Sequence, residues 1–134
     1  MLLLRLTAQG TSAANRRDFD VVLTGFDPEI DLWIARGGLN VPDYAGHHHG
    51  HAGYREAWRR LLEAFDDLTW EPEELIDAGD HLIVVNRWSG HGAGSGVPVN
   101  QMMFQVYTLR RGLVVKQEDF AERGEALEAA GLSE

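Results

Sequence analysis

The chain has 134 residues, 44% hydrophobic and 25% charged, which is typical of a single globular domain spanning residues 1–134. It has no cysteine, which excludes disulfide scaffolds and thiol nucleophiles. A net charge of −9 argues against nucleic acid and anionic membrane as partners. The N-terminal apolar run, residues 1–4, is too short for a signal peptide or a membrane span. We therefore expect a cytoplasmic protein.

The first half of the sequence has the periodicity of helices. Over residues 15–26 apolar side chains recur at spacings of three and four, which predicts a helix with Asn15 as its cap. A weaker helix is expected over residues 2–13, where Thr, Gly and Ser are poor helix formers. Residues 52–65 carry apolar side chains on one face and charged ones on the other, so this helix has one buried and one solvated face.

A short strand and a long loop separate these helices. Residues 30–35 alternate as a strand does, and the Gly, Asn, Pro and Asp that follow indicate a loop running to about residue 50. A histidine cluster closes this loop and consists of His47, His48, His49 and His51.

The histidine cluster has two interpretations. Imidazoles are good ligands for zinc or nickel, but three adjacent side chains rarely converge on one ion. We therefore expect solvated loop histidines, no bound metal and no cofactor. Within the cluster, His49 or His48 is a candidate acid or base leaning over the mouth of a pocket, since the pKa of an imidazole is near neutrality. His51 is expected at the start of the following helix.

The second half of the sequence changes to a period of two. Strands are predicted over residues 68–76, 82–90, 97–109 and 114–123, joined by short links that make them antiparallel neighbours. Pro72 removes a hydrogen-bond donor, so the first of these strands is expected at an edge or to be bulged there. A last helical turn is expected over residues 125–130. Helices followed by a meander predict an α+β fold, with the helices on one face of a curved antiparallel sheet.

Alternation along these strands assigns some side chains to a face. Arg87 and Ser89 suit solvent or a partner chain, which turns Asn86 and Trp88 toward the helices. Along residues 97–109 both alternating sets are largely apolar, so alternation alone does not decide which set faces inward. An apolar second face also suggests that another subunit covers it.

Six short segments keep an order and spacing that are specific only in combination. They are residues 17–20, 26–29, 50–58, 75–80, 105–112 and 118–120. Together they resemble the SnoaL-like polyketide cyclase and ketosteroid isomerase superfamily, from about residue 15 to the end of the chain. That superfamily has the nuclear transport factor two-like fold. The resemblance implies a cone-shaped, curved antiparallel sheet, with helices packed on its concave face, that encloses one pocket.

The resemblance also implies which side chains surround that pocket. The implied ligand-binding residues are Asn86, Trp88, Gln101, Met103, Gln105, Tyr107 and Gln117, together with Asp119. Phe26 and Trp58 join this set as aromatic residues, with core packing as their alternative role. The opposite face, with Val85, Met102, Phe104 and Val106, is implied to form a homodimer.

Asp119 and His49 are the candidate catalytic residues. Aromatic neighbours would desolvate Asp119 and raise its pKa, which suits proton abstraction next to a carbonyl. Steroid isomerisation itself is not favoured, because Gln105 stands where the resemblance places an acidic hydrogen-bond donor. Two functions stay open. One is a cofactor-independent cyclase, isomerase or hydratase acting on a small apolar carbonyl compound, and the other is a non-catalytic ligand-binding or dimeric accessory domain.

Overall fold

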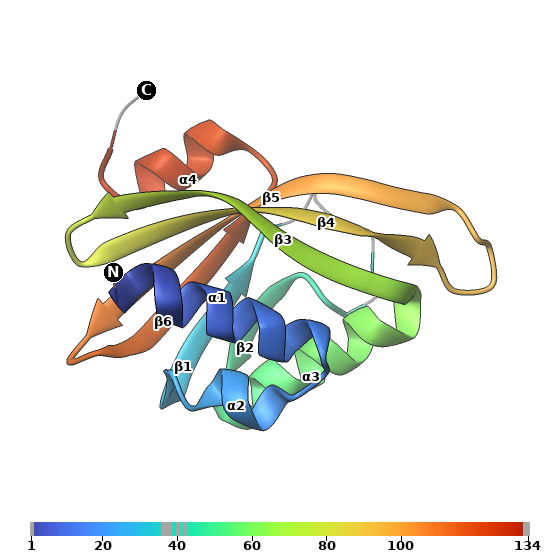
Figure 1. The fold of residues 1–134 in the computed structure, drawn as a ribbon, viewed down its shortest axis with the longest axis horizontal. Coiled ribbons are helices and arrows are strands. Elements are labelled where there is room, and N and C mark those ends of the chain that lie inside the picture. Colours follow the sequence, from blue (N-terminus) through green and yellow to red (C-terminus); the bar gives the residue numbers. More distant parts are fainter. Residues whose placement is uncertain (1, 36–38, 40, 42, 133–134) are drawn as a thin grey trace.

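A single curved sheet of six strands organises the molecule (Figure 1). The computed structural model describes residues 2–35, 39, 41 and 43–132. The sheet order is β2-β1-β6-β5-β4-β3. The strands are β1 (Phe26–Ile34), β2 (Gly46–His49), β3 (Phe65–Ala78), β4 (His81–Gly92), β5 (Pro98–Arg110) and β6 (Leu113–Phe120). The helices are α1 (Leu2–Asn15), α2 (Phe19–Leu23), α3 (Gly50–Ala64) and α4 (Arg123–Ala129).

The sheet is mixed, which corrects the expected antiparallel sheet. β1 and β6 pair in parallel, with Ile34 opposite Asp119, while the other neighbouring strands are antiparallel. A hairpin link fixes antiparallel direction between consecutive strands, but β1 and β6 come from opposite ends of the chain. Period-two alternation carries no information about the direction of such a pair. The fold is otherwise the expected α+β arrangement.

The N-terminal helical region is divided differently from the prediction. Instead of one helix over residues 15–26, α1 ends at Asn15 and α2 begins at Phe19. Arg17 adopts a left-handed conformation with φ 64°, which interrupts the helix. The Asn15 side chain does not cap a helix but exchanges two hydrogen bonds with the backbone of Trp70, at 2.9 and 3.0 Å. These bonds attach α1 to β3.

The strand and loop between α2 and α3 also need correction. β1 begins at Phe26 rather than residue 30. Part of the predicted loop, residues 36–38, 40 and 42, lies outside the described residues. The end of that loop is β2, so His47, His48 and His49 lie on a strand paired with β1 instead of in a solvated loop. Four residues without an apolar alternation gave no strand signal in the sequence.

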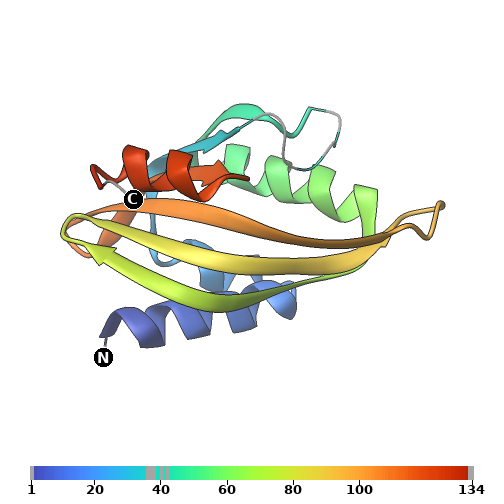
Figure 2. The ribbon, with the colours of Figure 1, turned by 90° about the horizontal axis from the view of Figure 1, so that it is seen from above.

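The two faces of the sheet are covered by different helices. Leu23, Tyr54 and Trp58 from α2 and α3 pack with strand residues in the larger core, whereas α4 lies on the other side of the sheet from α1 and α2 (Figures 1 and 2). Pro72 lies on an edge strand beside a shift in register, as predicted.

The apolar outer face is covered in part by the chain itself. Val85 and Val106 are 3% and 0% exposed beneath α4, which supplies some of the cover that the sequence had suggested would come from a second subunit. Met102 and Phe104 stay partly buried at the edge of this cluster. The homodimer therefore stays a prediction, with a smaller available surface than expected.

Candidate functional site

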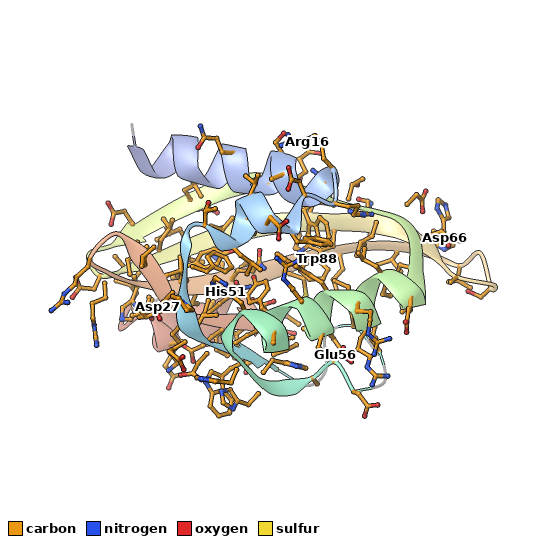
Figure 3. All side chains as sticks on the ribbon, turned by 90° about the horizontal axis from the view of Figure 1, so that it is seen from below. Arg16, Asp27, His51, Glu56, Asp66 and Trp88 are labelled. Carbon is orange, nitrogen blue, oxygen red and sulfur yellow. The ribbon has the colours of Figure 1, made fainter. Side chains whose placement is uncertain are left out.

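A cavity of about 220 Å³ lies between the sheet and the first three helices. Most of its wall consists of apolar and aromatic side chains. Eight of the residues singled out from the sequence line it, and these are Phe26, Trp58, Asn86, Trp88, Gln105, Tyr107, Gln117 and Asp119. Trp88 comes from β4 and lies between the sheet and the helices (Figure 3). A largely apolar wall with a few polar groups is the character of a site for a small molecule.

Gln101 and Met103 do not belong to the described lining of the cavity. They share the inward face of β5 with Gln105, but Met103 is packed into the core at 1% exposure. The half-buried Gln101 directs its amide to the Met103 sulfur at 3.5 Å. Alternation predicts the face of a strand but not how far along that face the cavity extends. Trp88, which lies opposite Gln101 on β4, does line the cavity, so the cavity reaches this level of the sheet on β4 but not on β5.

His49 is also outside the cavity lining formed by the described residues, and its expected position at the pocket mouth is wrong. Its ring nitrogens contact Asp31 and Glu29, each at 2.9 Å, on the outer side of β1. These two carboxylates raise the pKa of His49, mainly through hydrogen bonding. His48 faces the other way and binds the Tyr44 carbonyl oxygen at 2.6 Å. His51 lies in the first turn of α3, as expected.

Asp119 is the centre of a buried hydrogen-bond network. The Gln117 amide donates to Asp119 Oδ1 at 2.8 Å, and the Gln105 side chain also hydrogen-bonds this carboxyl. The Gln117 oxygen in turn accepts from the Tyr54 hydroxyl, and the Gln105 oxygen accepts from the Asn86 amide. Each amide can therefore present its NH2 group to the carboxylate. Both arms of the network donate toward Asp119.

Burial sets the protonation of this network. Asp119 is 2% exposed, and desolvation raises its pKa to about 7, while hydrogen bonds from Gln117 and Gln105 act in the opposite direction. Burial also raises the pKa of Tyr54 and Tyr107, so both hydroxyls stay protonated at neutral pH. Asp119 is thus a carboxyl that can gain or lose a proton near neutrality beside hydroxyls that cannot.

Two polar atoms in the cavity wall lack a partner. Asn86 Oδ1 and Trp88 Nε1 are buried and make no hydrogen bond to any described residue. A buried polar group without a partner costs about 1–3 kcal/mol, so such groups are rare unless they have a use. One of these atoms is an acceptor and the other a donor. Both residues line the cavity, although these two atoms are themselves fully buried in this structure.

Sequence reasoning did not assign several wall residues to the site. Tyr54 was visible on the apolar face of the predicted helix over 52–65, but its hydroxyl bond to Gln117 was not. Tyr44 follows the part of the loop that lies outside the described residues and carried no periodic signal, although it is buried in the cavity wall. The wall formed by α1 and Trp70 depends on the docking of that helix on β3, which local sequence does not report.

Solved structures share this architecture. TerC, co-crystallised with polyporic acid, has a TM-score of 0.78 and 20% identity, over 96% of this chain and 97% of that chain. An NTF2-like protein from Burkholderia thailandensis E264 has a TM-score of 0.76 and 27% identity, over 88% of each chain. A candidate SnoaL-like polyketide cyclase from Jannaschia sp. CCS1 has a TM-score of 0.73 and 19% identity, over 87% of this chain and 83% of that chain.

Three further findings concern membrane segments and the family. A search of curated proteins finds no match. Within the described residues, no helix has the length and apolar character needed to cross a membrane.

The family model of the SnoaL-like domain matches residues 8–117, which include β1 to β5 and most of β6. The match covers most of the sequence and agrees with the fold of the solved structures, so the chain belongs to the SnoaL-like domain family.

Proposed function

We propose that the cavity binds a small apolar molecule bearing a carbonyl group, and that Asp119 moves a proton at the carbon next to that carbonyl without a cofactor. The observation that carries this proposal is a carboxyl that is 2% exposed, lines the cavity and has its pKa raised to about 7 by burial. A general base is most effective when its pKa lies near the working pH. Asp119 meets that condition.

The proton transfer can be written from the residues of the wall. The Asp119 carboxylate removes a proton from the carbon next to the carbonyl, and the electron pair of that C–H bond forms an enolate. The Trp88 indole N–H is buried without a partner among the described residues, and a small movement of its ring would let it donate to the enolate oxygen, where negative charge develops. The protonated Asp119 then returns the proton at a second position. Return of the proton to another carbon gives isomerisation. In a cyclisation the enolate carbon instead attacks a second carbonyl carbon of the same molecule, and Asp119 gives its proton to the alkoxide formed there, so neither reaction consumes an external reagent.

The alternative is a pocket that binds without catalysis. Gln105 and Gln117 were its main support in the sequence, because amides do not transfer protons at neutral pH. Both amides are engaged with Asp119, so they hold the carboxyl instead of offering their groups to a ligand. Asn86 and Trp88 remain for recognition, and a binding role alone would need only these two.

Two probes separate these functions. Polyporic acid, which was co-crystallised with TerC, is the probe for binding, followed through tryptophan fluorescence because Trp58, Trp70 and Trp88 line the cavity. 2-Tetralone in D2O is the probe for catalysis, followed by NMR as hydrogen next to its carbonyl exchanges for deuterium. We expect the wild-type protein to accelerate this exchange. Asp119→Asn should slow it on the order of a hundredfold or more.

The control variant lies one residue away. Glu118 is on the other face of β6, so Glu118→Gln should leave the exchange rate unchanged. Binding of polyporic acid without acceleration of exchange by the wild-type protein would support the non-catalytic alternative. Failure to bind either probe would contradict a pocket for apolar carbonyl compounds.

A further inference from the structure

A second cluster of chemically active side chains lies on the outer face of the sheet. β2 pairs antiparallel with β1, which places His49 opposite Asp31 and His47 opposite Trp33. His47 and His49 are two residues apart on a strand, so both side chains point to the same side. His47 Nε2 lies 2.7 Å from Asp31 Oδ1, and His49 Nδ1 lies 2.9 Å from the same oxygen.

The three ligand atoms are close enough to surround one ion. One nitrogen from each histidine and a carboxylate oxygen of Asp31 all lie within 4.8 Å of one another. Zinc binds imidazole nitrogen at about 2.0–2.1 Å and carboxylate oxygen at about 2.0–2.2 Å. Small side-chain rotations would therefore bring all three atoms to an ion placed between them. The paired backbones of β1 and β2 hold the residues in this arrangement.

Neighbouring groups fix the orientation of both imidazoles. Glu29 Oε2 lies 2.9 Å from His49 Nε2, the ring nitrogen that faces away from Asp31. A carboxylate on the outer nitrogen of a metal-binding histidine holds the ring and raises its basicity. The Trp33 ring stacks on His47, with centroids 4.1 Å apart and an interplanar angle of 16°. Glu29 and Trp33 are independent of the three ligands, and each supports one of the imidazoles.

We propose that Asp31, His47 and His49 bind a divalent transition-metal ion of the zinc class, with Glu29 orienting His49 and water completing the coordination. Two imidazole ligands favour zinc, cobalt or nickel over magnesium and calcium, which prefer oxygen. The proposal reverses the expectation of no bound metal. That expectation treated the histidines as adjacent loop residues, whereas alternation on β2 turns His48 away and brings His47 and His49 together.

A metal at this position would join the edge strand β2 to β1. β2 leads directly into α3, which carries Tyr54 and Trp58 into the cavity wall. The ion would therefore hold the beginning of that wall from the opposite face of the sheet. This effect concerns stability and does not depend on the catalytic role proposed for Asp119.

The test uses tag-free, chelator-treated full-length protein titrated with Zn²⁺ by calorimetry. We expect one ion per chain, bound with micromolar or tighter affinity, and no comparable binding of Mg²⁺. His47→Gln and His49→Gln should each abolish zinc binding, and Glu29→Gln should weaken the zinc affinity by about 10-fold. Co²⁺ gives a second readout, because its visible absorption reports nitrogen and oxygen ligation.

His91→Gln is the matched control, because His91 is an exposed histidine that contacts only the carboxylate of Asp67 among the interactions described, at 3.1 Å. It should leave zinc binding unchanged. Circular dichroism checks that each variant is folded, and Asp31→Asn replaces any histidine variant that is not. Absence of one-to-one zinc binding by the wild-type protein would overturn the proposal. Equal weakening by His91→Gln would also overturn it, since binding would then be adventitious.

Discussion

Asp31 and Asp119 lie on neighbouring strands, yet their pKa values are shifted in opposite directions. Asp119 is 2% exposed and accepts hydrogen bonds from neutral amides, and burial raises its pKa to about 7. The side chain of Asp31 is 41% exposed, and hydrogen bonds from His49 and His47 lower its pKa. Two carboxyls of one sheet thus acquire different chemistry from solvent access and from the charge of their partners. The inner one suits proton transfer and the outer one suits cation binding.

The largest expected change in the free energy of unfolding comes from removing the buried charge of Asp119. The folded pKa of Asp119 is raised above its unfolded value, so the folded state holds an extra proton between about pH 4 and pH 7. The free energy of unfolding therefore falls as pH rises through that window. Three pKa units correspond to an upper bound of about 4 kcal/mol. Asp119→Asn should remove this slope and make the protein more stable at pH 8.

Urea unfolding of both proteins at pH 4 and pH 8 measures this effect. Wild type and Asp119→Asn should differ little at pH 4, where the folded carboxyl is protonated and the unfolded carboxyl is only about half ionised. Glu118→Gln is the control and should keep the wild-type slope. An Asp119→Asn protein less stable than wild type at pH 8 would mean that the network stabilises the carboxylate more than burial destabilises it.

An intermediate effect is expected at the outer end of one arm of the network. Tyr54→Phe removes the hydroxyl that donates to Gln117 and leaves a buried amide oxygen without its donor. We expect a loss of about 1–3 kcal/mol in the free energy of unfolding, measured with urea at pH 7. Tyr107→Phe removes another cavity hydroxyl, one with no described bond to Gln117, and should cost less. Equal losses would show that the Tyr54–Gln117 bond contributes nothing specific.

The smallest effect is expected on the outer face. Asp31→Asn in metal-free protein should change the free energy of unfolding by less than about 1 kcal/mol, because exposed ion pairs are screened by solvent. The lowered pKa of Asp31 means that its contribution is present above about pH 4 and is lost as pH falls further. This dependence is opposite in sign to that of Asp119. Urea unfolding at pH 3 and pH 7, in low and high salt, measures it.

The sequence predicted the inner site better than the outer one, for a physical reason. Asn86, Gln105 and Asp119 lie on long strands with one buried face, where alternation determines which side chains point inward. All three line the cavity. β2 has four residues and no apolar alternation, so only its pairing with β1 reveals that His47 and His49 converge. The interruption between α1 and α2 was hidden for a similar reason, since it depends on contacts of Asn15 and Arg17 with β3.

The parallel pairing of β1 with β6 has a consequence for folding kinetics. Ile34 and Asp119, which face each other across it, are about 85 positions apart in the chain, whereas the hairpins of β3, β4 and β5 join near neighbours. Closing a loop of that length has a large entropic cost, so high contact order slows the step that requires it. We expect the meander to form early and β1 to dock late. The strands of the meander would then form their side of the cavity before β1 completes its wall.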